Sequence, residues 1–124
     1  MNYLYVFLGG GIGSMLRYGI SVFTIRNVEQ KWAPLAGTFG ANILACILLA
    51  ILVKGEQSGA LSRPAFLLLG TGLCGGFSTF STFSLETFAF WSRGDHAWAI
   101  ANVLVSVTLG FAAMWLLLKS WPSA

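Results

Sequence analysis

The sequence has few ionisable side chains. Seven basic and four acidic residues make up 9% of its 124 residues, whereas soluble domains average about 25%. There is one histidine, and the two cysteines, Cys46 and Cys74, lie in apolar segments without the spacing of a disulfide framework or a zinc site. Because no nucleophile, base and orienting group occur together, we expect no enzyme activity. Because the basic residues form no patch, we expect no nucleic-acid partner.

Apolar residues, by contrast, are abundant and lie in four long segments. Residues 32–53, 64–85 and 97–118 contain no charged side chain, and residues 1–25 contain only Arg17. A helix needs about 20 predominantly apolar residues to cross the hydrocarbon core of a membrane, and a soluble fold this apolar would expose larger patches than monomers tolerate. We therefore predict an all-α membrane protein with one transmembrane domain. The domain covers residues 1–124, with spans at about 3–25, 33–53, 64–91 and 97–119.

The basic residues outside the spans are divided evenly between the two ends of the predicted bundle. Those on the side of both termini and of the second loop are Lys54, Arg63 and Lys119, and those on the other side are Arg26, Lys31 and Arg93. Because excess Lys and Arg mark the cytoplasmic side, an even division predicts insertion in both orientations. Such insertion requires opposite copies to pair, so we expect an antiparallel homodimer with dual topology. The alternative is that one loop charge dominates and the balance is accidental.

The first span carries small residues and a charge on one face. Gly9, Gly13 and Arg17 follow one another at a spacing of four residues, and glycines at this spacing let another helix approach closely. A guanidinium within a span costs at least about 2.5–3.5 kcal/mol by insertion scales. Arg17 therefore either has a structural role or reaches the interface, or it is a vestibule charge that concentrates anions.

Polar residues form stripes on the second and fourth spans. Thr38, Asn42 and Cys46 recur at a spacing of four residues, as do Asn102 and Ser106. The amide of Asn42 has donors and an acceptor to satisfy in an apolar medium. Interhelical hydrogen bonds would satisfy them, and lining a polar path is the alternative use. The stripe on the fourth span is placed to complete such a path.

Four glycines lie close together in the third span, at positions 70, 72, 75 and 76. They weaken a helix near its middle. Close crossing of another helix would also explain them, but the hydroxyl residues that follow at once favour a break. A broken helix at this depth is tolerated only where its backbone is buried in protein or lines a cavity. Its free carbonyl and N–H groups can then coordinate ions.

Aromatic and hydroxyl residues alternate after the predicted break. Phe80 and Phe83 lie along one side of a helix, and Thr79, Thr82 and Glu86 lie along another. The edge of a phenyl ring is partially positive, so ring edges and hydroxyl donors together suit a small, strongly hydrated anion. Without a fixed positive charge such an ion is not trapped, as conduction requires. Glu86 is expected near the edge of the membrane and is not expected to carry protons.

Residues 9–18, 37–42 and 72–83 resemble the Fluc/CrcB family of fluoride channels, and the resemblance covers the whole chain in length, span count and motif order. It implies a fluoride-selective channel that lowers cytoplasmic fluoride by passive efflux across the bacterial inner membrane. In this family two antiparallel subunits form two pores around a structural sodium ion. The resemblance therefore implies Na⁺ as a cofactor at the dimer interface, and fluoride, a second copy of the chain and the lipid bilayer as partners.

The resemblance also implies which residues act. The implied pore residues are Phe80, Phe83, Asn42, Ser81, Thr82 and Ser106. The main-chain carbonyls of Gly75 and Ser78 would hold the sodium ion. Family members often have threonine where this chain has Ser78 and phenylalanine where it has Leu73, and neither difference changes a carbonyl ligand.

A proton-coupled small multidrug-type exporter is the alternative function, because such exporters are also four-span dimers with dual topology. They need a membrane-embedded carboxylate in the first span to exchange protons for cationic drugs. Here the first span carries Arg17 and no acid, which argues against this function. A scaffold subunit without transport activity would explain the small residues but not the aromatic and hydroxyl segment.

Overall fold

The computed structural model describes residues 1–120, and every regular element in this part of the chain is helical. In chain order the elements are α1 (Asn2–Asn27), α2 (Ala33–Gln57), α3 (Arg63–Phe66), the π-helix η1 (Leu67–Cys74), α4 (Gly75–Phe77), α5 (Phe80–Ser92) and α6 (His96–Leu118). The segments long and apolar enough to cross a membrane are Asn2–Asn27, Ala33–Gln57, Arg63–Ser92 and His96–Leu118. The predicted all-α fold with four membrane spans is confirmed. Trp121, whose position near the end of the last predicted span is typical of an interfacial tryptophan, lies outside the described residues.

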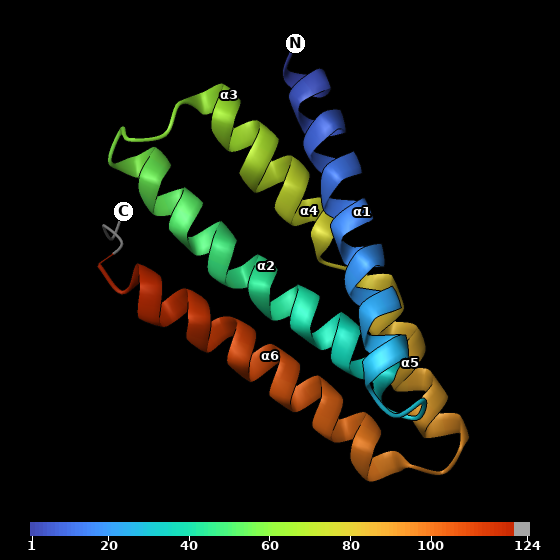
Figure 1. The fold of residues 1–124 in the computed structure, drawn as a ribbon. Helices are drawn as coiled ribbons and strands as arrows, with labels where there is room; N and C mark the ends of the chain where they lie inside the picture. Colours follow the sequence, from blue (N-terminus) through green and yellow to red (C-terminus); the bar gives the residue numbers. More distant parts are fainter. Residues whose placement is uncertain (121–124) are drawn as a thin grey trace.

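The four spans alternate in direction (Figure 1). α1 and the third span run away from the end that holds the N-terminus, and α2 and α6 run back toward it. α1 packs along η1 and α4, α2 packs against both α1 and α6, and α5 packs against α6. The two halves of the third span therefore have different neighbours, and the break between them lies where α1 and α2 meet that span.

Large apolar side chains cover the outside of the bundle. On α1, for example, Tyr3, Phe7 and Tyr18 are 92%, 75% and 72% exposed. The buried cluster is small and consists of Ala41, Ala45 and Phe77, with Ile20 packed against it. A helix bundle that is apolar all round is suited to lipid as its solvent. The chain is a multi-pass membrane protein.

Glycines bring α1 into main-chain contact with the third span. A Cβ at Gly9 would overlap the carbonyl of Leu68, and a Cβ at Gly13 would overlap the carbonyl of Leu73. From the other side, a Cβ at Gly76 would overlap the carbonyl of Gly10. The small-residue spacing of the first span thus serves close helix packing.

Replacing Gly13 with alanine is expected to destabilise the bundle, because the added methyl group meets main chain and not a side chain that can rotate away. Overpacking of this kind costs about 1–3 kcal/mol. Gly11→Ala is a matched control on the same helix, since a Cβ there meets nothing within 4 Å. Thermal unfolding in detergent should give a lower midpoint for Gly13→Ala than for Gly11→Ala. Equal midpoints would contradict the close contact.

The third span is interrupted at Ser78 (φ −79°, ψ 158°) and Thr79 (φ −150°, ψ 121°), both of which have extended backbone. The four glycines lie before this point, within η1 and α4. Gly72 and Gly76 approach the main chain of α1, so these two glycines serve close crossing, and the break follows them. η1 is a π-helix of eight residues, a rare conformation that often occurs at functional sites.

Candidate functional site at the helix break

Asn42 on α2 bonds both main-chain polar groups of one residue, Thr79, at the break. Its Oδ1 accepts a hydrogen bond from the N–H of Thr79 at 2.7 Å, and its Nδ2 donates to the carbonyl of Thr79 at 3.1 Å. These bonds stand in for intrahelical bonds that are lost where the helix is interrupted. Of the two uses considered for Asn42, interhelical hydrogen bonding is present, and the side chain also borders a hollow described below.

Two other carbonyls just before the break have donors within the chain. Arg17 reaches across from α1, and its Nε donates to the carbonyl of Gly76 at 3.1 Å. The carbonyl of Cys74 accepts from the N–H and from the Oγ of Ser78, each at 3.0 Å. Arg17 therefore has a structural contact beside the break, and its role as a vestibule charge stays a prediction.

Two carbonyls at the break lose the donor that a continuous α-helix would supply. The donor for Gly75 would be the N–H of Thr79, which instead bonds Asn42. The donor for Ser78 would be the N–H of Thr82, which instead bonds the Oγ1 of Thr79 at 3.2 Å. Carbonyl oxygens freed in this way at a broken membrane helix are suitable ligands for Na⁺. The residues assigned to a sodium ion thus fit it chemically.

Both of these residues border a hollow of about 350 Å³ between α2 and η1. Its lining residues are Ala45, Cys46, Leu49, Phe66, Gly70, Thr71, Cys74, Gly75 and Ser78. Gly75 is exposed there, and a Cβ at this position would meet nothing within 4 Å. Within residues 1–120 no three His, Cys, Asp or Glu side chains are grouped to hold a metal ion. A cation at this place would therefore depend on main-chain and hydroxyl oxygens.

A second hollow of about 270 Å³ lies at the start of α5. It is lined by Asn42, Cys46, Ser78, Thr79, Phe80, Phe83, Ser106 and Val107. Four of the six implied pore residues therefore meet here, and they come from α2, α5 and α6. Because Cys46 and Ser78 line both hollows, the two are adjacent.

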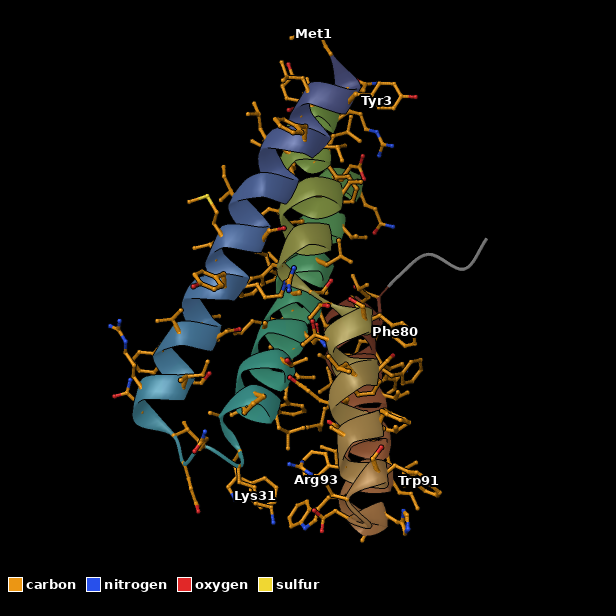
Figure 2. All side chains as sticks on the ribbon, turned by 90° about the vertical axis from the view of Figure 1, so that its right-hand side faces the viewer. Met1, Tyr3, Lys31, Phe80, Trp91 and Arg93 are labelled. Carbon is orange, nitrogen blue, oxygen red and sulfur yellow. The ribbon has the colours of Figure 1, made fainter. Side chains whose placement is uncertain are left out.

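The two phenylalanines of this second hollow form a tilted pair. Their ring centroids are 6.0 Å apart and their planes differ by 39°. Phe80 is 79% exposed and points away from the helices at the start of α5 (Figure 2). One wall of the hollow is therefore open in a single chain, and another surface is needed to enclose the rings.

Ser81 and Thr82 lie in the first turn of α5 but do not line this hollow. They are joined to it through Thr79, whose Oγ1 lies 3.3 Å from the Oγ of Ser81 and donates to the Oγ1 of Thr82 at 3.2 Å. The three hydroxyl groups thus form a cluster beside the main chain of Thr79, which Asn42 bonds. That Ser81 and Thr82 line a passage stays a prediction.

A carboxylate lies farther along α5 and is bonded to α2. The Oγ1 of Thr38 donates to the Oε1 of Glu86 at 2.6 Å. The other oxygen of Glu86 is buried and has no hydrogen-bond partner in the described part of the chain. The contact was not predicted, although Thr38 shares the stripe of Asn42 and Glu86 shares the stripe of Thr79, and facing stripes were a usable signal.

A second polar network that was not predicted joins α5 to α6. The buried Asn102 donates from its Nδ2 to the Oγ1 of Thr87 at 2.9 Å, and the Oγ of Ser106 donates to the Oδ1 of Asn102 at 3.4 Å. Thr87 in turn donates to the carbonyl of Phe83 at 2.8 Å. This network fixes α6 against the helix that carries the two phenylalanines.

Fold and site together define a membrane protein of four spans. Its third span is broken at a point that Asn42 bonds, beside a hollow lined by Phe80 and Phe83. Residues 4–118 match the family described as "CrcB-like protein, Camphor Resistance (CrcB)". The "Fluoride-specific ion channel FluC 1" of Streptomyces avermitilis is 38% identical over 98% of this chain and 99% of its own length. The "Fluoride-specific ion channel FluC" of Paracoccus denitrificans is 41% identical over 91% of this chain and 88% of its own length. The chain belongs to the CrcB family.

Proposed function

We propose that this chain is a fluoride-selective ion channel that lowers cytoplasmic fluoride by passive efflux across the bacterial inner membrane. The observation that carries the proposal is the hollow at the helix break, where Asn42, Phe80, Phe83 and Ser106 converge. Relatives similar over nearly their whole length are described as fluoride-specific ion channels. The activity proposed is transport and not catalysis.

The chemistry of the hollow suits a small anion in transit. Phenyl edges present partial positive charge, and the hydroxyls of Thr79 and Ser106 lie beside them. To donate to an anion these hydroxyls would turn from Thr82 and Asn102, their present acceptors. Arg17, the basic residue within the first span, is bonded to the carbonyl of Gly76 and does not line the hollow. An anion is therefore attracted by weak, distributed partners that also release it, which is the condition for conduction.

The functional unit in this proposal is an antiparallel homodimer. Exposed Phe80 leaves the hollow open on one side, and a second copy would close it. The even division of basic residues between the two ends of the bundle supports opposite orientations of the two copies. Two-fold symmetry would then give two equivalent pathways.

A sodium ion at the dimer interface is part of the same proposal. Gly75 and Ser78 supply two carbonyls whose α-helical donors bond elsewhere, and a symmetric partner would supply two more. The ion would stabilise these opposed main-chain oxygens and add positive potential near the anion pathway. The first span carries no acidic residue, so the carboxylate that a proton-coupled exporter needs there is missing.

Ion efflux from liposomes tests the function. Protein reconstituted with Na⁺ should release fluoride down its gradient, with no imposed proton gradient, and should release chloride far more slowly. Reconstitution with an impermeant organic cation in place of Na⁺ should lower the fluoride rate. Equal fluoride and chloride rates would contradict the selectivity, and a rate that is the same without Na⁺ would contradict the sodium site.

A further inference from the structure

An apolar groove of about 240 Å³ lies between the first halves of α2 and α6. Its main lining residues are Trp32, Leu35, Phe39, Trp98, Ala101 and Val105. The hollows that α6 forms with α5 are bordered instead by Val103 and Val107. Val103 is two positions from Ala101 and from Val105, which is about 200° around an α-helix. Most of the groove lining on α6 therefore faces away from the hollows that α6 forms with α5, and Ser106 alone borders both the groove and the candidate pathway.

Two basic side chains lie near the groove, just before the first residues of α2 and of α6. The Nζ of Lys31 lies 5.0 Å from the ring centroid of Trp32, and the Cζ of Arg93 lies 5.1 Å from that of Phe90. The Trp32 ring is 6.1 Å from Phe90 and 4.7 Å from Trp98, centroid to centroid. One aromatic cluster thus joins both cations to the groove, and Figure 2 shows Lys31 and Arg93 at the same end of the molecule.

Neither cation is neutralised by a neighbour. The one ion pair among residues 1–120 joins Arg63 to Glu56, at the other end of the bundle. Glu29 and Asp95 lie in the same two loops as the cations but form no ion pair with them. With Arg26 also at this end, basic residues outnumber acidic ones, and Lys31 and Arg93 are free to bind an anion.

We propose that the groove binds one acyl chain of an anionic phospholipid whose phosphate headgroup is bound by Lys31 and Arg93. Tryptophans such as Trp32 and Trp98 favour the depth of the headgroups, so the cations lie at the level of lipid phosphates and the groove runs below them into the acyl region. Basic side chains next to a span raise affinity for anionic lipid about fivefold each. Charge selects the headgroup, and the groove gives the lipid a fixed position.

Native mass spectrometry of the full chain tests the headgroup contact. With phosphatidylglycerol and phosphatidylcholine of identical acyl chains added together, the protein should retain phosphatidylglycerol preferentially. Lys31→Gln/Arg93→Gln should lower that preference about 25-fold, from two contributions of about fivefold each. The matched control, Lys54→Gln/Lys119→Gln, removes two charges at the opposite end and should leave the preference unchanged. An unchanged preference in the first variant, or an equal fall in the control, would overturn the proposal.

Filling the groove tests the acyl contact. Ala101→Phe should reduce retention of both lipids without changing the charge, and gel filtration should show a folded protein of unaltered oligomeric state. Glycerol phosphate, which has the headgroup chemistry without a chain, should fail to displace bound phosphatidylglycerol at the same concentration. Displacement by glycerol phosphate would show an ion site with no lipid specificity. Dissociation of an oligomer by Ala101→Phe would show that a second copy occupies the groove. Either result would overturn the proposal.

Discussion

Replacing Phe80 or Phe83 with alanine is expected to slow fluoride efflux at least about tenfold, which corresponds to about 1.4 kcal/mol in the transport barrier. Both rings border the hollow at the helix break, beside Asn42 and Ser106. Truncation removes the partially positive ring edges that replace part of the hydration of the anion. It also widens the passage, so chloride should be excluded less well. Liposome efflux with fluoride and chloride electrodes measures both effects.

The exposure of Phe80 separates this effect from loss of folding. Phe80 is 79% exposed in a single chain, so its truncation removes little packing within the protomer. Phe7→Ala is a matched control, because Phe7 is 75% exposed on α1 and does not line the hollow. The control should conduct fluoride at the unmodified rate. Normal efflux from Phe80→Ala and Phe83→Ala, with an unaltered oligomeric state on gel filtration, would refute the assigned pathway.

Asn42→Leu is expected to destabilise the break and to abolish most fluoride efflux. Leucine has a similar size but cannot bond either the N–H or the carbonyl of Thr79, both of which Asn42 satisfies. A polar group left unsatisfied in an apolar environment costs about 1–3 kcal/mol. The backbone of Thr79 then lacks its two partners on α2, so the break becomes more mobile and the rings of α5 that follow it lose their fixed position.

Hydrogen exchange locates this change. Amides of residues 75–85 should exchange faster in Asn42→Leu than in the unmodified chain, and the thermal midpoint in detergent should fall. Asn27→Leu makes the same substitution at the exposed end of α1, where the amide bonds only the carbonyl of Phe23 in its own helix. If both variants show the same exchange near Thr79, the two hydrogen bonds of Asn42 do not maintain the break.

The four helices were predictable because, apart from Arg17 and Glu86, the charged residues lie in the short connections or at the ends of the apolar segments. Every segment that crosses the bundle is apolar over a length that hydrocarbon requires. The close packing of α1 was predictable in the same way, since Gly9 and Gly13 repeat at a helical spacing. Such features depend on residues near one another in the chain, and local pattern describes them well.

The place of the break was not predictable from local pattern. Each glycine weakens a helix by about 1 kcal/mol, and that preference pointed to residues 70–76, which remain helical. The break occurs at Ser78 and Thr79 because Asn42, 37 positions earlier in the chain, supplies both bonds that Thr79 needs. The pairing of Thr38 with Glu86 depends likewise on which faces of α2 and α5 meet. Neither contact follows from periodicity within one span.

The chain order of the groups that satisfy the break has a consequence for biogenesis. Arg17 and Asn42, which bond the main chain at Gly76 and Thr79, both precede the third span in synthesis. When residues 63–92 leave the ribosome and enter the bilayer, the side chains that hydrogen-bond the interrupted backbone have already been synthesised. These hydrogen bonds at the break can therefore form without waiting for any residue translated later.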